Sequence, residues 1–314
     1  HRVHTSSRRI ACRATPQRRH NRLPVETADA NHDVVDPSTP HSRRRAILGM
    51  LCACGGCAGS SLIDPRGAAE AMVKLIEPEA RLEELFDVER EARLDQTFAK
   101  GMNTMMGGFE DAVRERKLKL FDTLLEGYDG AEEVSICEIG AGTLPNGKYL
   151  ARAERGPKRI DLVAIDPNDS MRAYAEENLK DVQLANDREI DLRFRHGVGE
   201  ALPLEDGSVD ALISTLTLCS VRDPEQTMKE IKRVLKPGGK FLFLEHVLSE
   251  SDPKFAALQE KLTPMQIQVA DGCHLNRRTL ETIQNAGFKR VDAEYYELDG
   301  FWVIAPQVCG IAEA

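Results

Sequence analysis

Two glycines one residue apart, Gly140 and Gly142, follow a short apolar run over residues 134–139 that contains the carboxylate Glu138. Because glycine lacks a Cβ atom, the chain can turn sharply there and a ligand can lie against the main chain. A second apolar run ends at Asp166, 24 positions beyond Gly142. An acidic residue about 20 positions after such a turn meets ribose hydroxyls in dinucleotide-binding folds. The spacing therefore predicts a ligand that carries a ribose.

A parallel sheet is needed to bring these residues together. Short apolar or β-branched runs predict strands at 134–139, 160–165, 192–196, 209–216 and 240–246. Helical patterns alternate with them, at 145–153, 170–179, 223–235, 253 onward and 277–286. This alternation predicts βαβ units. Two late strands at 290–297 and 301–305, joined by Asp299-Gly300, predict an antiparallel hairpin.

A helical segment precedes the first strand, and we expect residues 72–127 to form a lid ahead of a core over 128–314. Its first helix is expected over 77–97, and its second is interrupted by Gly101 and by Gly107-Gly108. Met102, Met105 and Met106 lie at this break. Such methionines either fill a core or belong to a mobile lid over the ligand.

The charge of this 314-residue chain is unevenly spread. Residues 1–45 carry ten arginines and four acids and therefore a net charge of +6. Because the whole chain has a net charge of −9, residues 46–314 have a net charge of −15. An acidic body argues against a nucleic-acid partner, because phosphate binding needs basic surface. Of eight cysteines, the last four lie far apart beside apolar runs and are predicted to be reduced, buried thiols: Cys137, Cys219, Cys273 and Cys309.

Residues 1–71 have the composition of a targeting region. Residues 1–23 hold seven arginines and no acid, which is typical of a transit peptide, and Arg43-Arg44-Arg45 precedes a short apolar run as in a twin-arginine signal. We expect a chloroplast location, stromal or thylakoid-associated; the alternatives are another organelle or an endomembrane surface, or a disordered tail that touches a membrane. Cys52, Cys54 and Cys57 lack partner ligands, so no metal site is predicted.

An ordered set of motifs resembles the class I S-adenosylmethionine-dependent methyltransferases over about residues 98–306. The set comprises Glu138-x-Gly140-x-Gly142, Asp166, Gly199-Glu200-Ala201-Leu202-Pro203, Asp210 and Arg233-Val234-Leu235-Lys236-Pro237-Gly238-Gly239. Three further motifs resemble the branch that includes alkyl-thiol S-methyltransferases: Leu218-Cys219-Ser220-Val221, Glu245-His246-Val247 and Asp271-Gly272-Cys273. The resemblance implies an α/β, Rossmann-like fold with a seven-stranded, mostly parallel sheet, an antiparallel last strand and helices on both faces.

The same resemblance implies S-adenosylmethionine as the cofactor. Gly140 and Gly142 would pass under its methionine and ribose portions, Glu138 would organise the turn, and Asp166 would hold the ribose hydroxyls. The resemblance also assigns further residues to the cofactor site: Ala141, Pro167, Gly199, Glu200 and Thr215.

Two positions depart from the family pattern. The usual third glycine is Leu144, and Val198 stands where a carboxylate often meets the adenine amine, so adenine would depend on backbone groups near Gly199 and Glu200. A dinucleotide dehydrogenase fits less well, because its fingerprint needs the third glycine. Nucleic-acid amino-methyltransferases also fit less well, since residues 215–218 lack the Pro-Pro-aromatic turn that cradles a flipped base.

Methyl transfer requires mainly that the acceptor be held in line and that water be excluded. A thiol acceptor is only a few per cent ionised at neutral pH, so a base would help. His246, at the end of a predicted strand, is the candidate base, and Asp271 is a second catalytic candidate from a nearby loop. Alternatively, His246 is a hydrogen-bonded histidine in a buried turn, and Asp271 with His274 forms a capping loop.

Taken together, the sequence predicts a methyltransferase for a small, apolar acceptor, with thiol S-methylation favoured. C-methylation of a prenylated quinone or related lipid is the alternative enzymatic function. A protein that binds S-adenosylmethionine without transferring the methyl group is the non-enzymatic one. Small-molecule and peripheral membrane contacts are expected, and no oligomeric state is predicted.

Overall fold

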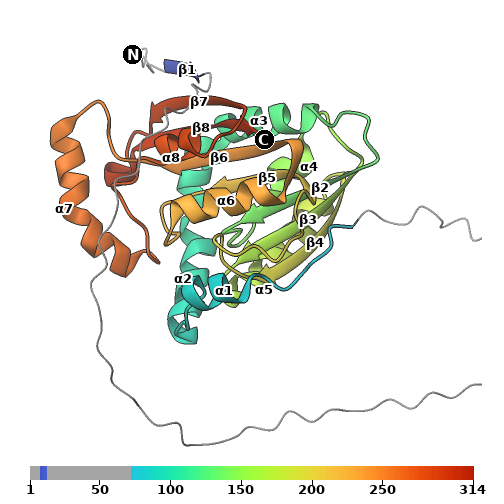
Figure 1. Ribbon diagram of the computed structural model, residues 1–314, viewed down its shortest axis with the longest axis horizontal. Coiled ribbons are helices and arrows are strands. Elements are labelled where there is room, and N and C mark those ends of the chain that lie inside the picture. The colour runs from blue at the N-terminus through green and yellow to red at the C-terminus, as the bar shows by residue number, and fades with distance from the viewer. Residues whose placement is uncertain (1–7, 13–71) are drawn as a thin grey trace, which may run out of the picture. The chain divides into compact units, whose positions relative to one another are not determined.

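One twisted sheet runs through the part of the chain that the structure, a computed structural model, describes: residues 8–12 and 72–314 (Figure 1). Its eight strands are β1 (Arg8–Cys12), β2 (Glu133–Ile139), β3 (Arg159–Asp166), β4 (Glu189–His196), β5 (Val209–Thr215), β6 (Leu235–His246), β7 (Arg290–Glu297) and β8 (Pro306–Glu313). They lie side by side in the order β1-β7-β8-β6-β5-β2-β3-β4.

Strands β2 to β6 are parallel to one another, whereas β8 lies between β6 and β7 and is antiparallel to both. The predicted α/β fold, with seven mostly parallel strands and an antiparallel last strand, is therefore confirmed. The short strand β1 adds an antiparallel partner to the outer edge of β7. The rest of the predicted targeting region lies outside the described residues.

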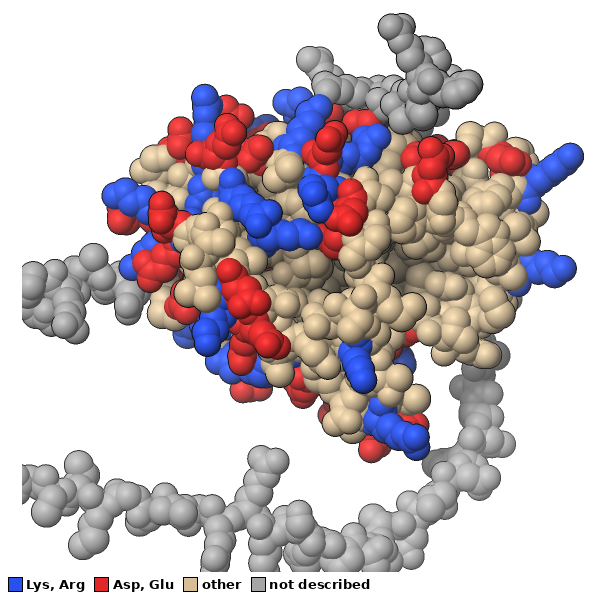
Figure 2. All heavy atoms as spheres, turned by 180° about the vertical axis from the view of Figure 1, so that it is seen from behind, with Lys and Arg blue, Asp and Glu red and all other residues tan. Residues whose placement is uncertain are grey.

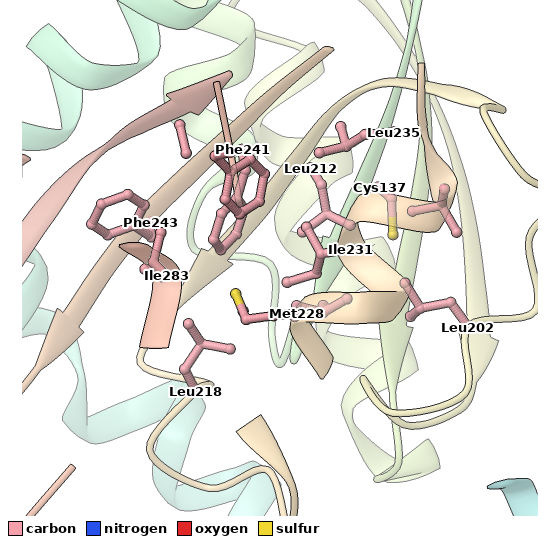
Figure 3. Close-up of a cluster of buried hydrophobic side chains, with 14 of the residues drawn as sticks. Cys137, Leu202, Leu212, Leu218, Met228, Ile231, Leu235, Phe241, Phe243 and Ile283 are labelled. Atoms are coloured by element: carbon pink, nitrogen blue, oxygen red, sulfur yellow. The ribbon is translucent and has the colours of Figure 1, made fainter. Parts of the chain in front are cut away.

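Helices cover both faces of the sheet (Figure 1). They are α1 (Ala80–Phe86), α2 (Ala92–Met105), α3 (Gly107–Glu126), α4 (Gly147–Arg152), α5 (Arg172–Gln183), α6 (Pro224–Val234), α7 (Pro253–Val269) and α8 (Thr279–Asn285), with short 3-10 turns η1 (Asp169–Met171) and η2 (Trp302–Ile304). One buried apolar cluster joins the sheet to α6 and α8, where Met228, Ile231 and Ile283 point toward Phe241 and Phe243 of β6 (Figure 3). A second cluster joins the opposite face to α3, α4 and α5.

Strand β5 shows why the sheet has these two faces. Leu212 belongs to the cluster under α6, whereas its neighbours Ala211 and Ile213 belong to the cluster under α3 to α5, and all three are fully buried. A central parallel strand covered on both sides has to be apolar at successive positions. The apolar run that predicted this strand is therefore also what fixes it at the centre of the sheet.

Helix α6 begins where its sequence predicts. Asp223 precedes the first turn, and its carboxylate Oδ1 accepts a hydrogen bond from the Gln226 N–H at 2.9 Å. Pro224 occupies the first helical position, where a missing N–H group costs nothing. This start places the loop between β5 and α6 against the end of the sheet where β5 finishes.

Two predicted segments differ from the structure. Residues 301–305 do not form a strand: Trp302 adopts a φ of +43°, residues 302–304 form η2, and the last strand starts at Pro306. The hairpin link is longer than Asp299-Gly300 because the Leu298 N–H donates to the Ala305 carbonyl and closes a wider loop. The helix predicted over 77–97 is interrupted at 87–91, between α1 and α2.

The surface carries both signs of charge. On the face seen in Figure 2, lysines and arginines are interspersed with aspartates and glutamates on one side of the view, and uncharged surface is broad on the other. None of the helices within the described residues combines the length and the hydropathy that a bilayer-spanning segment requires.

The pairing of β8 with β7 gives a direct test of this topology. A Cβ atom added at Gly310 would lie 2.2 Å from the Asp292 carbonyl oxygen and 2.9 Å from the Ala293 Cα, both backbone atoms of β7. We predict that Gly310→Ala lowers the free energy of unfolding by about 3 kcal/mol, because neither strand can yield without losing its pairing.

Gly101→Ala in α2 is the matched control, since an added Cβ meets no atom within 4 Å there. It should raise the free energy of unfolding by up to about 1 kcal/mol, because alanine favours the helix. Both values are measured by urea unfolding. A Gly310→Ala protein as stable as the unaltered chain would contradict the described pairing of β7 with β8.

Candidate active site

A cavity of about 410 Å³ opens at the carboxyl ends of the parallel strands. Its walls come from the loops that follow β2, β3, β4 and β5, from the segment around α1 and α2, and from the loop after α7. Ligands of open α/β sheets bind in the crevice that the loops form beyond the carboxyl ends of the strands.

The turn after β2 forms the floor of the cavity. Gly140 and Gly142 have φ values of +57° and +54°, a region that residues with a Cβ rarely adopt. At Gly140 an added Cβ would lie 2.3 Å from the Thr217 hydroxyl, so a larger residue does not fit. At Gly142 no such atom lies closer than 4.0 Å, and the open space there is cavity. Leu144 takes a φ of +59°, so the chain keeps the turn although the usual glycine is missing.

Asp166 joins this turn to the end of β3. Its Oδ2 accepts a hydrogen bond from the Gly142 N–H at 2.9 Å, and its Oδ1 accepts one from the Asn168 N–H at 2.8 Å. Burial raises the pKa of the Asp166 carboxyl to about 6. Both Asp166 and Pro167 line the cavity. Because a carboxylate oxygen has two lone pairs, each of these oxygens can also accept a ligand hydroxyl.

Glu138 lies behind the turn rather than on the cavity wall. Its Oε1 accepts a hydrogen bond from Asn146 Nδ2 at 2.8 Å, and the same Nδ2 donates to the Thr215 hydroxyl at 2.9 Å. Burial raises the pKa of Glu138 to about 7. Glu138 and Thr215 therefore hold the start of α4 against the ends of β2 and β5, and Ala141 is likewise buried, at 1% exposure.

The loop after β4 forms the next wall, with Val198, Gly199 and Glu200 on the cavity. The Glu200 side chain turns away: its Oε1 accepts hydrogen bonds from the backbone N–H groups of Arg222 and Asp223. A ligand next to this loop would therefore contact mainly backbone atoms and the Val198 side chain.

Residues ahead of β2 cover the cavity. Phe86 ends α1, Val88 follows it, and Phe98 and Met102 lie on α2; all four are on the wall. The part of the predicted lid that forms α3 instead packs on the sheet, beside β6 and β8. The segment 72–127 thus contains two different pieces, a cover over the cavity and a layer of the core.

Arg90 fastens this cover. Its guanidinium pairs with Asp95 at the start of α2 and with Asp271 in the loop after α7, at 2.7 and 2.8 Å. Asn168 adds a second tie, because its Nδ2 donates to the Asp95 carbonyl at 3.0 Å. The Arg90–Asp271 ion pair and the Asn168–Asp95 hydrogen bond therefore hold the cover against the loops that follow α7 and β3.

Two histidines lie near the far side of the cavity. His246 ends β6 and is 2% exposed, and its Nε2 lies 3.1 Å from the Cys273 sulfur; it is not on the cavity wall. His274 is on the wall, with Nδ1 2.7 Å from the Gly272 carbonyl oxygen. The same Nδ1 lies 3.2 Å from the Cys219 carbonyl oxygen and 3.3 Å from Arg277 Nη2. Because the two carbonyl oxygens only accept and lie closer than the arginine, we assign the hydrogen to Nδ1, which leaves Nε2 of His274 as the basic nitrogen.

The structure divides the predicted site residues into two groups. The cavity wall includes Gly140, Gly142, Asp166, Pro167, Gly199, Glu200 and Asp271. Behind it lie Glu138, Ala141, Thr215 and His246. Sequence reasoning missed Phe86, Val88 and Arg90, because no local motif tells which residues of a distant segment will fold over a sheet end. It also missed Thr217, which follows β5 directly but stands in no motif that marks it as a wall residue.

The sequence matches known methyltransferases. A family model described as a methyltransferase domain matches residues 137–243. A thiol S-methyltransferase of Homo sapiens is 30% identical over 207 residues, which are 65% of this chain and 80% of that protein. A thiol S-methyltransferase of Rattus norvegicus is 30% identical over 67% of this chain and 83% of its own length.

More distant matches agree on the fold. A ubiquinone/menaquinone biosynthesis C-methyltransferase of Klebsiella pneumoniae is 29% identical over 52% of this chain and 69% of its own length. Among solved structures, a chain in the complex of the Haloferax volcanii Trm112 methyltransferase activator with a methyltransferase superposes with a TM-score of 0.50. It is 19% identical, and the match covers 72% of this chain and 99% of that one.

Asp166→Asn tests whether the carboxylate at the end of β3 contacts the cofactor. The amide keeps the size of the side chain but removes the charge that strengthens hydrogen bonds from ribose hydroxyls. We predict that the dissociation constant for S-adenosylmethionine, measured by titration calorimetry, rises by about 10- to 100-fold. Asp169→Asn, in the same loop with a 64% exposed side chain, should leave it unchanged. Equal affinities in the two variants would contradict the placement.

Glu138→Gln tests the buried carboxyl behind the turn. Its pKa is about 7 in the folded protein and 4.5 ordinarily, so between these values the folded state binds more protons than the unfolded state. This difference in proton binding stabilises the folded state at low pH. The stabilisation is complete below about pH 4.5 and is lost as the pH rises to about 7, which lowers the free energy of unfolding by about 3 kcal/mol.

The glutamine variant should lack this share of the pH dependence, because its side chain does not titrate and still accepts from Asn146. Urea unfolding of both proteins at several pH values between about 4.5 and 7.5 measures the difference. Parallel pH profiles for the two proteins would show that Glu138 is ionised in the fold.

Proposed function

Because this chain belongs to the class I S-adenosylmethionine-dependent methyltransferases, we propose that it transfers the methyl group to the sulfur of a small, apolar thiol. The relatives support this acceptor class. The human and rat proteins, which are thiol S-methyltransferases, are matched over 80% and 83% of their lengths. The quinone C-methyltransferase is matched over a smaller share, 69%.

The observation that carries the proposal is the size and lining of the cavity. Its volume of about 410 Å³ lies near the lower end of the range for ligand sites, and a drug-sized cofactor would fill most of it. The space left is bordered by apolar side chains of the cover and of the loop after β5, such as Phe86, Met102 and Leu216. A small apolar acceptor fits such a remainder better than a prenylated quinone.

The residues on the floor fit S-adenosylmethionine. The open space at Gly142 allows a close approach to main chain, and the Asp166 carboxylate on the cavity wall can accept hydrogen bonds from a ribose diol. The bound cofactor supplies a methyl group already activated on a sulfonium. The chain itself then has to hold the acceptor in line and keep water out, and positioning of this kind accounts for about 7 to 11 kcal/mol of barrier.

A proton leaves the acceptor thiol during the reaction. His246, the base that the sequence favoured, is turned toward Cys273 behind the wall, and the Asp271 carboxylate is paired with Arg90. We therefore assign the proton to Nε2 of His274, which is on the wall. A neutral imidazole nitrogen on the wall can act as the general base for an acceptor held in the cavity.

Contact with a membrane surface is a further part of the proposal. Large apolar side chains are exposed on α7 and η2, namely Met265, Val269 and Trp302, at 52%, 69% and 64%. An apolar acceptor would concentrate in lipid, so a peripheral contact would bring the enzyme to it. The chloroplast location stays a prediction, since it depends on residues 1–71.

A panel of acceptors tests the proposed chemistry. The full chain is incubated with methyl-labelled S-adenosylmethionine and either a short alkanethiol, the alkanol of the same chain length or a prenylated quinol. We expect label in the thioether product at a rate at least tenfold above that with the alkanol, because a thiol ionises far more readily than an alcohol.

The Asp166→Asn protein gives the background of the assay at a cofactor concentration below its dissociation constant. Label in the quinol and none in the thiol would replace the proposal with C-methylation. Cofactor binding without transfer to any acceptor would leave a binding protein in its place.

A further inference from the structure

Three side chains with metal-binding atoms meet behind the cavity wall. Cys219 lies in the turn after β5, His246 is the last residue of β6, and Cys273 follows α7. All three are buried, with exposures of 2%, 2% and 7%. The fold thus brings together residues separated by 27 positions or more, from three connections at the same end of the sheet.

The distances suit one metal ion. The two sulfurs and one ring nitrogen lie within 4.8 Å of one another, and His246 Nε2 is 3.1 Å from the Cys273 sulfur. With zinc bonds of about 2.3 Å to sulfur and 2.0 to 2.1 Å to nitrogen, tetrahedral ligand atoms lie roughly 3.5 to 3.8 Å apart. The one separation of 3.1 Å and the upper limit of 4.8 Å each differ from this range by about 1 Å or less, so side-chain shifts of about 1 Å would close the site around an ion.

The ligand types point to zinc in particular. Thiolates and imidazole are the groups that zinc prefers, whereas calcium and magnesium take oxygen ligands. Both cysteines are free, with no disulfide to occupy their sulfurs. A set of three protein ligands leaves one tetrahedral position open, which is the pattern of catalytic rather than structural zinc sites.

The cluster lies directly behind the cavity wall. Ser220, next to Cys219, lines the cavity, and so do Gly272 and His274 on either side of Cys273. The wall between the cavity and the three atoms therefore consists of the short turns that carry the cysteines, and these turns have to part for an acceptor sulfur to reach the ion.

We propose that Cys219, His246 and Cys273 bind one zinc ion and that its open position receives the sulfur of the acceptor. The first half stands on the cluster alone, and the second half rests on the thiol acceptor of the proposed function. Coordination makes a thiol lose its proton, as it does for cysteine ligands. It also fixes the direction from which the sulfur attacks.

The step balances in atoms and charge. The S–H bond of the acceptor would break as its sulfur binds the zinc, and the proton would leave to solvent water. A sulfur electron pair then forms the new carbon–sulfur bond while the methyl carbon leaves the sulfonium, which becomes a neutral thioether. The methylated acceptor is also a neutral thioether and a weaker zinc ligand than a thiolate, so it can leave.

Metal content tests the first half. The full chain is produced with added zinc and dialysed against metal-free buffer, and zinc is measured by elemental analysis. We expect about one zinc ion per chain, near none in Cys219→Ser and in Cys273→Ser, and about one in Cys309→Ser. Cys309 is an equally suitable control because it is buried and free but belongs to another cluster.

Circular dichroism and affinity for S-adenosylmethionine show whether the serine variants are folded. A zinc-free chain, or serine variants that keep their zinc, would overturn the inference. Cobalt gives a readout on the unaltered chain should a variant not fold. Thiolate ligation then produces sulfur-to-cobalt charge-transfer absorption, and a cobalt-loaded chain without that absorption would also overturn it.

The cobalt-loaded chain tests the second half as well. Adding a short alkanethiol should change the visible cobalt spectrum, and adding the alkanol of equal length should not. A spectrum unchanged by the thiol would overturn the proposed acceptor ligation. If the chain is stripped of its zinc with a chelator and still methylates thiols at the full rate, the proposed acceptor ligation is wrong, whereas the proposed function stands. A spectral response without methyl transfer would instead contradict the proposed function.

Discussion

The hydrogen bond from the Gly142 N–H to Asp166 Oδ2 is the constraint on which the site depends. It ties together the ends of β2 and β3, two adjacent strands whose connecting helix α4 lies between them in sequence. A backbone donor and a charged acceptor at 2.9 Å make a bond that a shifted register would break. Because both groups also border the cavity, the bond that shapes the turn sets the distance between the two surfaces that hold the cofactor.

Buried polar groups arrange the remaining walls around this bond. Asn146 links Glu138 to Thr215, and Glu200 holds the end of the loop before α6 through two backbone N–H groups. Such groups need partners once they leave water, so their placement is determined as strongly as apolar packing is. The cover over the cavity is held differently, by Arg90, whose side chain is 23% exposed, and its two carboxylates. The floor is therefore rigid, and the cover is the part that can open for cofactor entry.

The sequence could predict the frame because each of its signals is local. The apolar runs at β2, β3 and β5, the glycines at 140 and 142 and the cap at Asp223 each need only a few neighbours to be interpreted. The start of β8 could not be predicted, because its apolar residues continue from η2 and only pairing with β6 and β7 decides where the strand begins. His246 and Cys273 were recognised separately as a candidate base and a core thiol. Their contact depends on how α7 brings its following loop back to the sheet.

The most direct measurement of the central claim is a double-mutant cycle between Asp166 and the ribose of the ligand. The affinities of S-adenosylhomocysteine and its 2′,3′-dideoxy counterpart are measured by calorimetry for the unaltered chain and for Asp166→Asn. If the Asp166 carboxylate accepts hydrogen bonds from the ribose hydroxyls, removing these hydroxyls weakens binding by about 10- to 100-fold in the unaltered chain and by much less in the variant. An equal loss in both proteins would show that the ribose lies elsewhere, and the account of the site would be wrong.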